Sequence, residues 1–85
     1  MPYRLSPLVE RDLDEIWSYL AEDATPTTAD RLVDDIIHGL DLLAEQPGVG
    51  RVRPEFGTGV RSFPVENYVI YYRQEGTDVL IIATS

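Results

Sequence analysis

The sequence feature that most constrains the fold is the stretch of residues 60–73, which has the pattern of a β-hairpin. Apolar side chains alternate along residues 60–65 and again along residues 68–73. The pair Glu66-Asn67 separates the two runs and is suited to a tight turn. This stretch therefore predicts two adjacent antiparallel strands.

Alternation assigns the side chains of this hairpin to two faces, because successive residues of a strand point in opposite directions. One face is expected to carry Arg61, Phe63, Val65, Tyr68, Ile70 and Tyr72. The other is expected to carry Ser62, Pro64, Val69, Tyr71 and Arg73. We interpret Tyr68 and Tyr72 as core aromatics whose hydroxyls reach the rim. The segments before the hairpin are suited to covering the first face and nothing in the chain is suited to covering the second, so we expect the second face to stay uncovered.

Two amphipathic helices precede the hairpin. Ser6 and Thr25 each stand before a proline, which combines a hydroxyl N-cap with a residue tolerated in the first helical turn. Apolar residues at helical spacing follow both signals and predict helices near residues 7–23 and 26–46. Because only two or three residues separate them, the helices are expected to fold back as an antiparallel pair.

Short apolar runs predict four strands, near residues 3–5, 60–65, 68–74 and 78–84. The last run is almost continuously apolar, which is typical of an interior strand covered on both faces. Residues 47–59 hold four glycines and two prolines, and are expected to form a loop. The prediction is a single α+β domain spanning residues 1–85, of order β-α-α-β-β-β, with a helix hairpin on one face of a small, mostly antiparallel sheet.

The charge is distributed unevenly along the chain. The net charge is −8, and all seven basic residues are arginines. Residues 1–45 hold three arginines and eleven acids, whereas residues 46–85 hold four of each. The acids are read as a solvated face of the helices. Nucleic-acid-binding domains show a strong basic field, so strong direct binding to nucleic acid is not expected. Only the second half could offer a local arginine cluster.

Few residues are candidates for catalysis or metal binding. The chain has no cysteine, and its one histidine, His38, is placed by helical spacing opposite the apolar stripe. There is neither a histidine pair for a metal nor a glycine pattern for a phosphate. We therefore expect no catalytic residue, no metal and no cofactor.

The sequence has no run of about 18 apolar residues and no basic-then-apolar leader, so neither a membrane span nor a signal peptide is expected. The lack of cysteine suits a cytoplasmic location.

Arginines near the hairpin have different expected roles. Arg61 shares a face with the core residues, and we expect it to form a structural ion pair with Asp41 or Glu45 at the end of the second helix. Arg73 lies on the uncovered face, where contact with a partner and simple solvation are equally supported alternatives.

The uncovered face is expected to be apolar. Val69 and Tyr71 should lie on it, joined by one of two pairs from the last strand: Val79 and Ile81, or Leu80 and Ile82. Each aliphatic side chain left in water forgoes ~1.5–3 kcal/mol of burial. A contiguous patch of this kind indicates an interaction surface.

Three segments of the chain resemble the ParE branch of the RelE/ParE toxin superfamily. They read DLDEIWSYLAED (12–23), ADRLVDDI…LDLLAEQPGVGR (29–51) and GVRSFPVENYVIYYR (59–73). The resemblance extends to about residue 82. Its most specific part is the RSFPV…YVIYYR hairpin that follows P-x-x-G-R.

This resemblance implies a toxin of a bacterial type II toxin–antitoxin module. Such a toxin inhibits DNA gyrase without being an enzyme, and is neutralised in a hetero-oligomeric complex with a ParD-like antitoxin. It also implies that the C-terminal segment of the antitoxin occupies the uncovered face, and lies across the helices as well. Contact with the antitoxin or the target is assigned to Val69, Tyr71, Arg73, Arg51 and Arg53.

Two alternatives stay open. RelE-type toxins cut mRNA at the ribosome with basic residues on the open sheet face and with an arginine and a tyrosine near the C-terminus. Here the position after Tyr68 is Val69, which is not basic, and the given sequence stops at Ser85 before any such C-terminal arginine and tyrosine. The second alternative is a non-toxic module that only binds an antitoxin, because family members usually continue past the last strand with a V-L-H-x-x-R-D-like tail.

Overall fold

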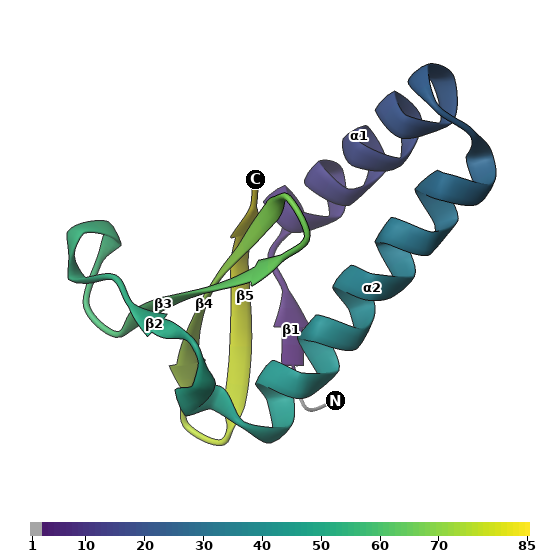
Figure 1. Cartoon of the computed structure of the whole chain (residues 1–85). Coiled ribbons are helices and arrows are strands. Elements are labelled where there is room, and N and C mark those ends of the chain that lie inside the picture. Colours follow the sequence, from purple (N-terminus) through teal and green to yellow (C-terminus); the bar gives the residue numbers. More distant parts are fainter. Residues whose placement is uncertain (1–2) are drawn as a thin grey trace.

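The computed structural model describes residues 3–85 and shows five strands in one sheet, with two long helices packed against it (Figure 1). The elements, in chain order, are β1 (Tyr3–Leu5), α1 (Pro7–Asp23), α2 (Pro26–Glu45), the 3₁₀ helix η1 (Pro47–Val49), β2 (Arg51–Val52), the 3₁₀ helix η2 (Pro54–Phe56), β3 (Val60–Val65), β4 (Tyr68–Glu75) and β5 (Asp78–Thr84). The α+β class is confirmed.

Both helices begin at the predicted caps. The Ser6 hydroxyl oxygen accepts a hydrogen bond from the Val9 amide at 3.3 Å and donates to the Ile82 carbonyl at 2.9 Å. This cap therefore also ties the start of α1 to β5. At α2, the Thr25 hydroxyl accepts from the Thr28 amide at 3.1 Å. No helix within residues 3–85 is long and apolar enough to cross a membrane.

The strands lie in the order β1-β5-β4-β3-β2. Only the β1–β5 pair is parallel, so the sheet is mostly antiparallel as expected, and β5 is an interior strand. In the predicted hairpin, Phe63 lies opposite Ile70. The turn between β3 and β4 places Glu66 at φ 54°, in the left-handed region that tight two-residue hairpins require.

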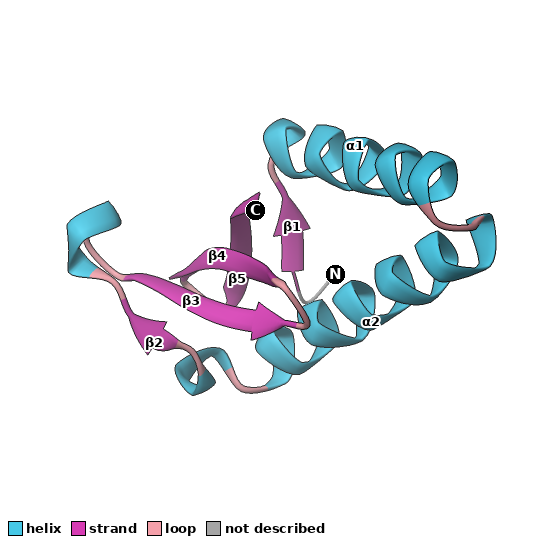
Figure 2. Cartoon of the chain, turned by 45° about the horizontal axis from the view of Figure 1, so that its top comes forward, coloured by secondary structure: helices cyan, strands magenta, loops and turns pink. Residues whose placement is uncertain are grey.

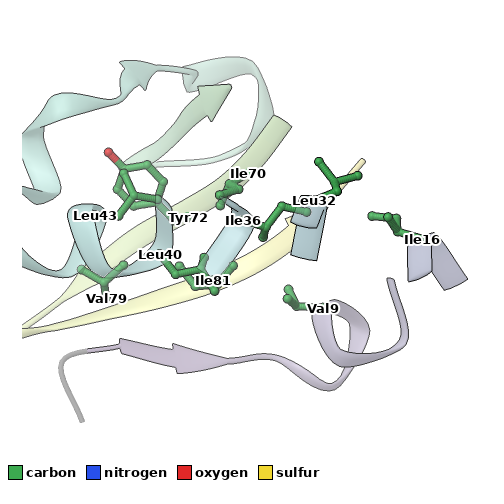
Figure 3. Packing of buried hydrophobic residues seen from close by; sticks show 10 residues of the cluster. All are labelled: Val9, Ile16, Leu32, Ile36, Leu40, Leu43, Ile70, Tyr72, Val79 and Ile81. Atoms are coloured by element: carbon green, nitrogen blue, oxygen red, sulfur yellow. The ribbon is translucent and has the colours of Figure 1, made fainter. Parts of the chain in front are cut away.

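The two helices lie on the same side of the sheet and enclose the core between themselves and the strands (Figure 2). The buried cluster consists of Val9, Ile16, Leu32, Ile36, Leu40, Leu43, Ile70, Tyr72, Val79 and Ile81 (Figure 3). Burial of a large aliphatic side chain is worth ~1.5–3 kcal/mol, so this layer supplies most of the stabilisation of a domain of this size. We call this side of the sheet the core face.

A β-bulge in β5 decides which of its residues face the helices. Tyr72 lies opposite Ile81 and Tyr71 lies opposite Ala83, so Ile82 is an extra residue in the ladder. Ile81 is fully buried on the core face, as is Val79. Of the two expected pairs, Leu80 and Ile82 therefore face away from the helices.

The segment of residues 47–59 is more structured than expected. Instead of a plain loop it contains η1, η2 and the short strand β2, which extends the sheet beside β3. The ring of Phe56 in η2 meets the ring of Tyr71 edge to face at a centroid distance of 5.2 Å. Val60 beside it is only 4% exposed. The expectation that nothing covers the second sheet face is therefore wrong around Tyr71.

Candidate functional site

The sheet face opposite the helices, which we call the open face, carries two neighbouring hollows of about 350 Å³ each. The aromatic hollow is lined by Phe56, Val60, Tyr71, Ile82, Ala83 and Ser85. The arginine trough is lined mainly by Val49, Arg51, Arg53, Ser62, Pro64 and Val69. Tyr71 of the first lies opposite Ser62 of the second, so the two hollows share one surface.

Strand register assembles the arginine trough. Arg51 lies opposite Ser62 in the β2–β3 pair, and Pro64 lies opposite Val69 in the β3–β4 pair. Residues that are directly paired share a face, and alternate residues of β3 do so as well. Together these two relations bring residues from three strands to one patch of the open face.

The buried side chain of Tyr72 fixes residues 47–50, the segment that directly precedes Arg51 and Arg53. The Tyr72 hydroxyl accepts a hydrogen bond from the Gly50 amide at 2.9 Å and donates one to the Pro47 carbonyl at 2.7 Å. Tyr72 is 0% exposed, so its hydroxyl does not reach the rim as the sequence suggested. Burial raises the pKa of the phenol above its ordinary value, although the Gly50 hydrogen bond and the charge of Arg61 oppose this shift. The neutral hydroxyl therefore remains available to donate.

Glycine is needed at position 50 for steric reasons. A Cβ atom there would lie 2.3 Å from the Tyr72 hydroxyl oxygen and 2.8 Å from the Ser62 carbonyl oxygen. These separations are far below ordinary contact, so a side chain would force the segment away from β3. Gly50 thus allows the close approach that β2 requires.

Arg61 reinforces the same segment. Its Nη1 donates hydrogen bonds to the carbonyl oxygens of Gly50 at 2.9 Å and of Gly48 at 3.5 Å. The structure therefore gives Arg61 backbone partners in place of the expected carboxylates of Asp41 or Glu45. A planar guanidinium suits this role because it can bind two carbonyl oxygens of a tight turn at once.

Arg51 and Arg53 come together at the trough but differ in how they are held. The Arg53 Nε donates to the Ser62 hydroxyl at 2.9 Å, and its Nη1 lies 3.6 Å from a Glu55 carboxylate oxygen. Its side chain is 28% exposed. Arg51 is exposed, and it belongs to none of the ion pairs found within residues 3–85.

Arg73 lies at the opposite end of the open face and is neutralised there. Its Nη2 is 2.7 Å from one Glu75 carboxylate oxygen, and the Arg4 Nη2 is 2.7 Å from the other. Arg4 also lies 3.8 Å from Asp78. The hydrogen bond from Arg73, together with Arg4, holds the pKa of the Glu75 carboxyl below its ordinary value. This end of the face is a closed charge network.

The structure thus divides the predicted contact residues into three places. Arg51, Arg53 and Val69 line the arginine trough, Tyr71 lines the aromatic hollow, and Arg73 belongs to the ion-pair network. The site residues predicted from the sequence did not include the lining residues Phe56, Val60, Ser62, Pro64 and Ala83, and Ile82 was expected on this face only as one of two alternatives. Ser62 and Pro64 carried a usable signal, because alternation already placed both on the open face.

The lining of the open face is mostly aromatic, aliphatic and cationic. Within residues 3–85, no three histidine or acidic side chains are grouped in a way that could hold a metal ion. His38 is an exposed residue of α2, a helix that packs on the core face, and is therefore remote from both hollows. What the hollows offer is aromatic and aliphatic surface beside two guanidinium groups.

Comparisons with known proteins agree with one another. The family model described as "ParE toxin of type II toxin-antitoxin system, parDE" matches residues 3–84. The chain is 31% identical over 72 residues to a protein named Toxin ParE1 from Caulobacter vibrioides, an alignment that covers 85% of this chain and 75% of the relative. It is 28% identical over 74 residues to Toxin ParE1 from Mycobacterium tuberculosis, covering 87% and 76%.

A solved structure has the same fold. The chain described as "Chromosomal ParDE TA system from P. aeruginosa" superposes with a TM-score of 0.85 and covers 100% of this chain and 94% of its own length. The two sequences are 24% identical, so this match bears on the fold alone.

Proposed function

The chain belongs to the ParE family of toxins of type II toxin–antitoxin systems, and on this premise we propose that it inhibits DNA gyrase and is neutralised by a ParD-like antitoxin. In this proposal it acts in the cytoplasm by binding its target, not by catalysis. The antitoxin contacts the open face through Arg51, Arg53, Val69 and Tyr71, and Arg73 lies at the margin of that contact.

The observation that carries the proposal is the exposed aromatic and aliphatic surface of the open face. Phe56 is 59% exposed and Val49 is 45% exposed, although both lie beside half-buried strand residues. Clusters of large apolar side chains on a small soluble domain are typical of protein-binding surfaces. Two arginines at the rim add the polar component that such surfaces need for specificity.

The RelE-like alternative, an mRNA endonuclease, finds less support on this face. Val69 and Pro64 occupy positions of the open face that would otherwise be available for basic side chains. Arg73, near the end of β4, is bound to Glu75 at 2.7 Å, so the cations left on this face are Arg51 and Arg53 of the trough. A site that stabilises the charge of a cleaved phosphodiester needs unpaired cations directed at it, and the central strand positions supply none.

A supercoiling assay tests the proposed target. Purified chain is titrated against DNA gyrase and relaxed plasmid, with and without its cognate antitoxin. We expect supercoiling to fall with rising toxin concentration and to recover when the antitoxin is added. A parallel assay measures mRNA cleavage on ribosomes.

The outcomes separate the three functions. Inhibition of gyrase that the antitoxin reverses supports the proposal. Ribosome-dependent cleavage with unaffected gyrase would replace it with the endonuclease. Antitoxin binding without either activity would identify a non-toxic binding module.

A further inference from the structure

The arginines of the sheet half of the molecule are not equally available for a ligand. Residues 46–85 contain Arg51, Arg53, Arg61 and Arg73. Arg61 is bound to backbone carbonyls, and Arg73 is bound to Glu75. The cations left for an external partner are those of the arginine trough, Arg51 and Arg53.

Arg53 is held ready for an anion. Its Nε is fixed by the hydroxyl of Ser62, a residue that is itself only 4% exposed. Its Nη1 lies 3.6 Å from Glu55, which is longer than a hydrogen bond. The terminal N–H groups of a guanidinium fixed in this way can bind a carboxylate with little further loss of side-chain entropy.

The trough also has an apolar wall, formed by Val49, Pro64 and Val69. Tyr72 and Arg61 anchor the turn that carries Val49 and Arg51, so the wall and the guanidinium groups keep a fixed separation. A ligand that fits must therefore present an anionic group beside an aliphatic one.

Main-chain recognition along the neighbouring edge is disfavoured. β2 pairs with Arg61 and Ser62, so within residues 3–85 the outer edge of β3 has no strand beside it from Phe63 onward. Pro64 falls in that stretch and has no N–H to donate to an added strand. Recognition at this site consequently relies on side chains.

Charge disfavours two other occupants. A nucleic acid needs a series of cations along its backbone, whereas the trough offers two arginines on a chain of net charge −8 that has no lysine. A second copy of this chain carries the same net charge, which opposes self-association. A single carboxylate on an otherwise uncharged segment avoids both difficulties.

We propose that the arginine trough binds an aspartate or glutamate side chain, flanked by an aliphatic residue, from an extended segment of the antitoxin. The identity of the partner rests on the proposed function, but the chemistry rests on the trough itself. The carboxylate is bound by the guanidinium groups of Arg53 and Arg51, and the aliphatic side chain packs on Val49 and Val69. Paired arginine–carboxylate hydrogen bonds supply both affinity and register.

Matched peptides test this chemistry without the antitoxin. The probes are ten-residue capped peptides that alternate Leu with Asn, with one central Asn replaced by Asp in the test peptide. Binding is followed by NMR of the folded chain, using backbone amides and arginine Nε–H signals. We expect the Asp peptide to bind at least about tenfold more tightly, as a charge-assisted pair does, and to shift the signals of Arg53 and Val69.

Variants locate the contact. Arg53→Gln and Arg51→Gln should each remove most of the preference for Asp, and Arg53→Lys should restore only part of it because an ammonium lacks the planar fork. Arg11→Gln, an exposed change on α1, is the matched control and should leave the preference unchanged. A melting curve for each variant verifies that it is folded.

Several results would overturn the inference. The first is equal binding of the Asn and Asp peptides, and the second is a change of NMR signals confined to the helices. The third is stronger binding of a ten-nucleotide oligo-dT at the same residues. None of them depends on gyrase. Failure of the supercoiling assay would refute the proposed target and leave the peptide result standing. Antitoxin binding by the Arg51→Gln/Arg53→Gln double variant at parental affinity would refute only the trough.

Discussion

The two faces of the sheet are made from the same strands but are covered in different ways. On the core face, Ile70 and Tyr72 are completely buried in the cluster that the strands share with α1 and α2. On the open face, their neighbours Val69 and Tyr71 are only half-buried, and η2 contacts Tyr71 through the ring of Phe56. The comparison teaches that neighbouring residues of one strand serve different ends, stability on the core face and, in the proposed function, partner binding on the open face.

The largest expected effect comes from truncating neighbours on opposite faces of β4. Ile70→Ala removes a fully buried side chain and should lower the free energy of unfolding by ~2–5 kcal/mol. Val69→Ala, one residue earlier, should cost less than about 1 kcal/mol because its site is already partly hydrated. Urea unfolding followed by circular dichroism measures both. Equal losses would show that the two faces contribute equally to stability.

The turn of residues 47–50, which Tyr72 and Arg61 hold in place, contains two glycines that provide the next contrast. Gly50→Ala places a Cβ against the Tyr72 hydroxyl and should destabilise the fold by ~1–3 kcal/mol. It should also weaken binding at the arginine trough, since the turn is displaced. Gly48→Ala meets no atom within 4 Å and should be nearly neutral. Thermal melts compare them, and a neutral Gly50→Ala would mean that the turn is not tightly anchored.

Removing the hydroxyl from each of two adjacent tyrosines measures how much the buried hydrogen bonds of Tyr72 contribute to stability. Tyr72→Phe leaves the Gly50 amide and the Pro47 carbonyl without their partner and should cost ~1–3 kcal/mol. Tyr71→Phe changes a half-exposed side chain on the open face and should have little effect on stability. Chemical denaturation distinguishes the two. A Tyr72→Phe variant as stable as the parent would indicate that water replaces the hydroxyl.

The smallest expected effect concerns the charge network at the end of the open face. The folded-state pKa of Glu75 lies below its ordinary value of 4.5, so its contribution to stability is present above that value and is lost as the pH falls through the folded pKa. Glu75→Gln should therefore lose less stability than the parent on acidification below about pH 4.5. Melting temperatures between neutral and acidic pH measure this, and parallel curves would contradict it.

The sequence predicted the elements that depend on local periodicity. Hydroxyl caps and apolar spacing placed α1 and α2 within a residue of their observed ends, and alternation assigned the faces of β3 and β4. The structure extends β4 to Glu75, one residue beyond the predicted end of the strand. Arg73 and Glu75 therefore share a face of β4, where they form an ion pair that the sequence analysis did not predict.

The features that the sequence did not predict depend on contacts between distant residues. The path of residues 47–50 is set by Tyr72 and Arg61, each of which lies more than ten positions after the backbone groups that it binds. The bulge at Ile82 depends on how β5 pairs with β4 and leaves no pattern of its own. The arginine trough depends on the first of these features, because Arg51 and Arg53 directly follow the turn that Tyr72 and Arg61 hold.

The most direct test of the account is the affinity of the cognate antitoxin for two point variants, measured by isothermal titration calorimetry. Tyr71→Asp places a carboxylate in the aromatic hollow, where covering it would cost several kcal/mol of hydration. The account predicts binding weakened about tenfold or more. His38→Ala changes an exposed residue on the helix side and should leave the affinity unchanged. A folded Tyr71→Asp variant that binds the antitoxin as tightly as the parent would contradict the assignment of the open face as the partner surface.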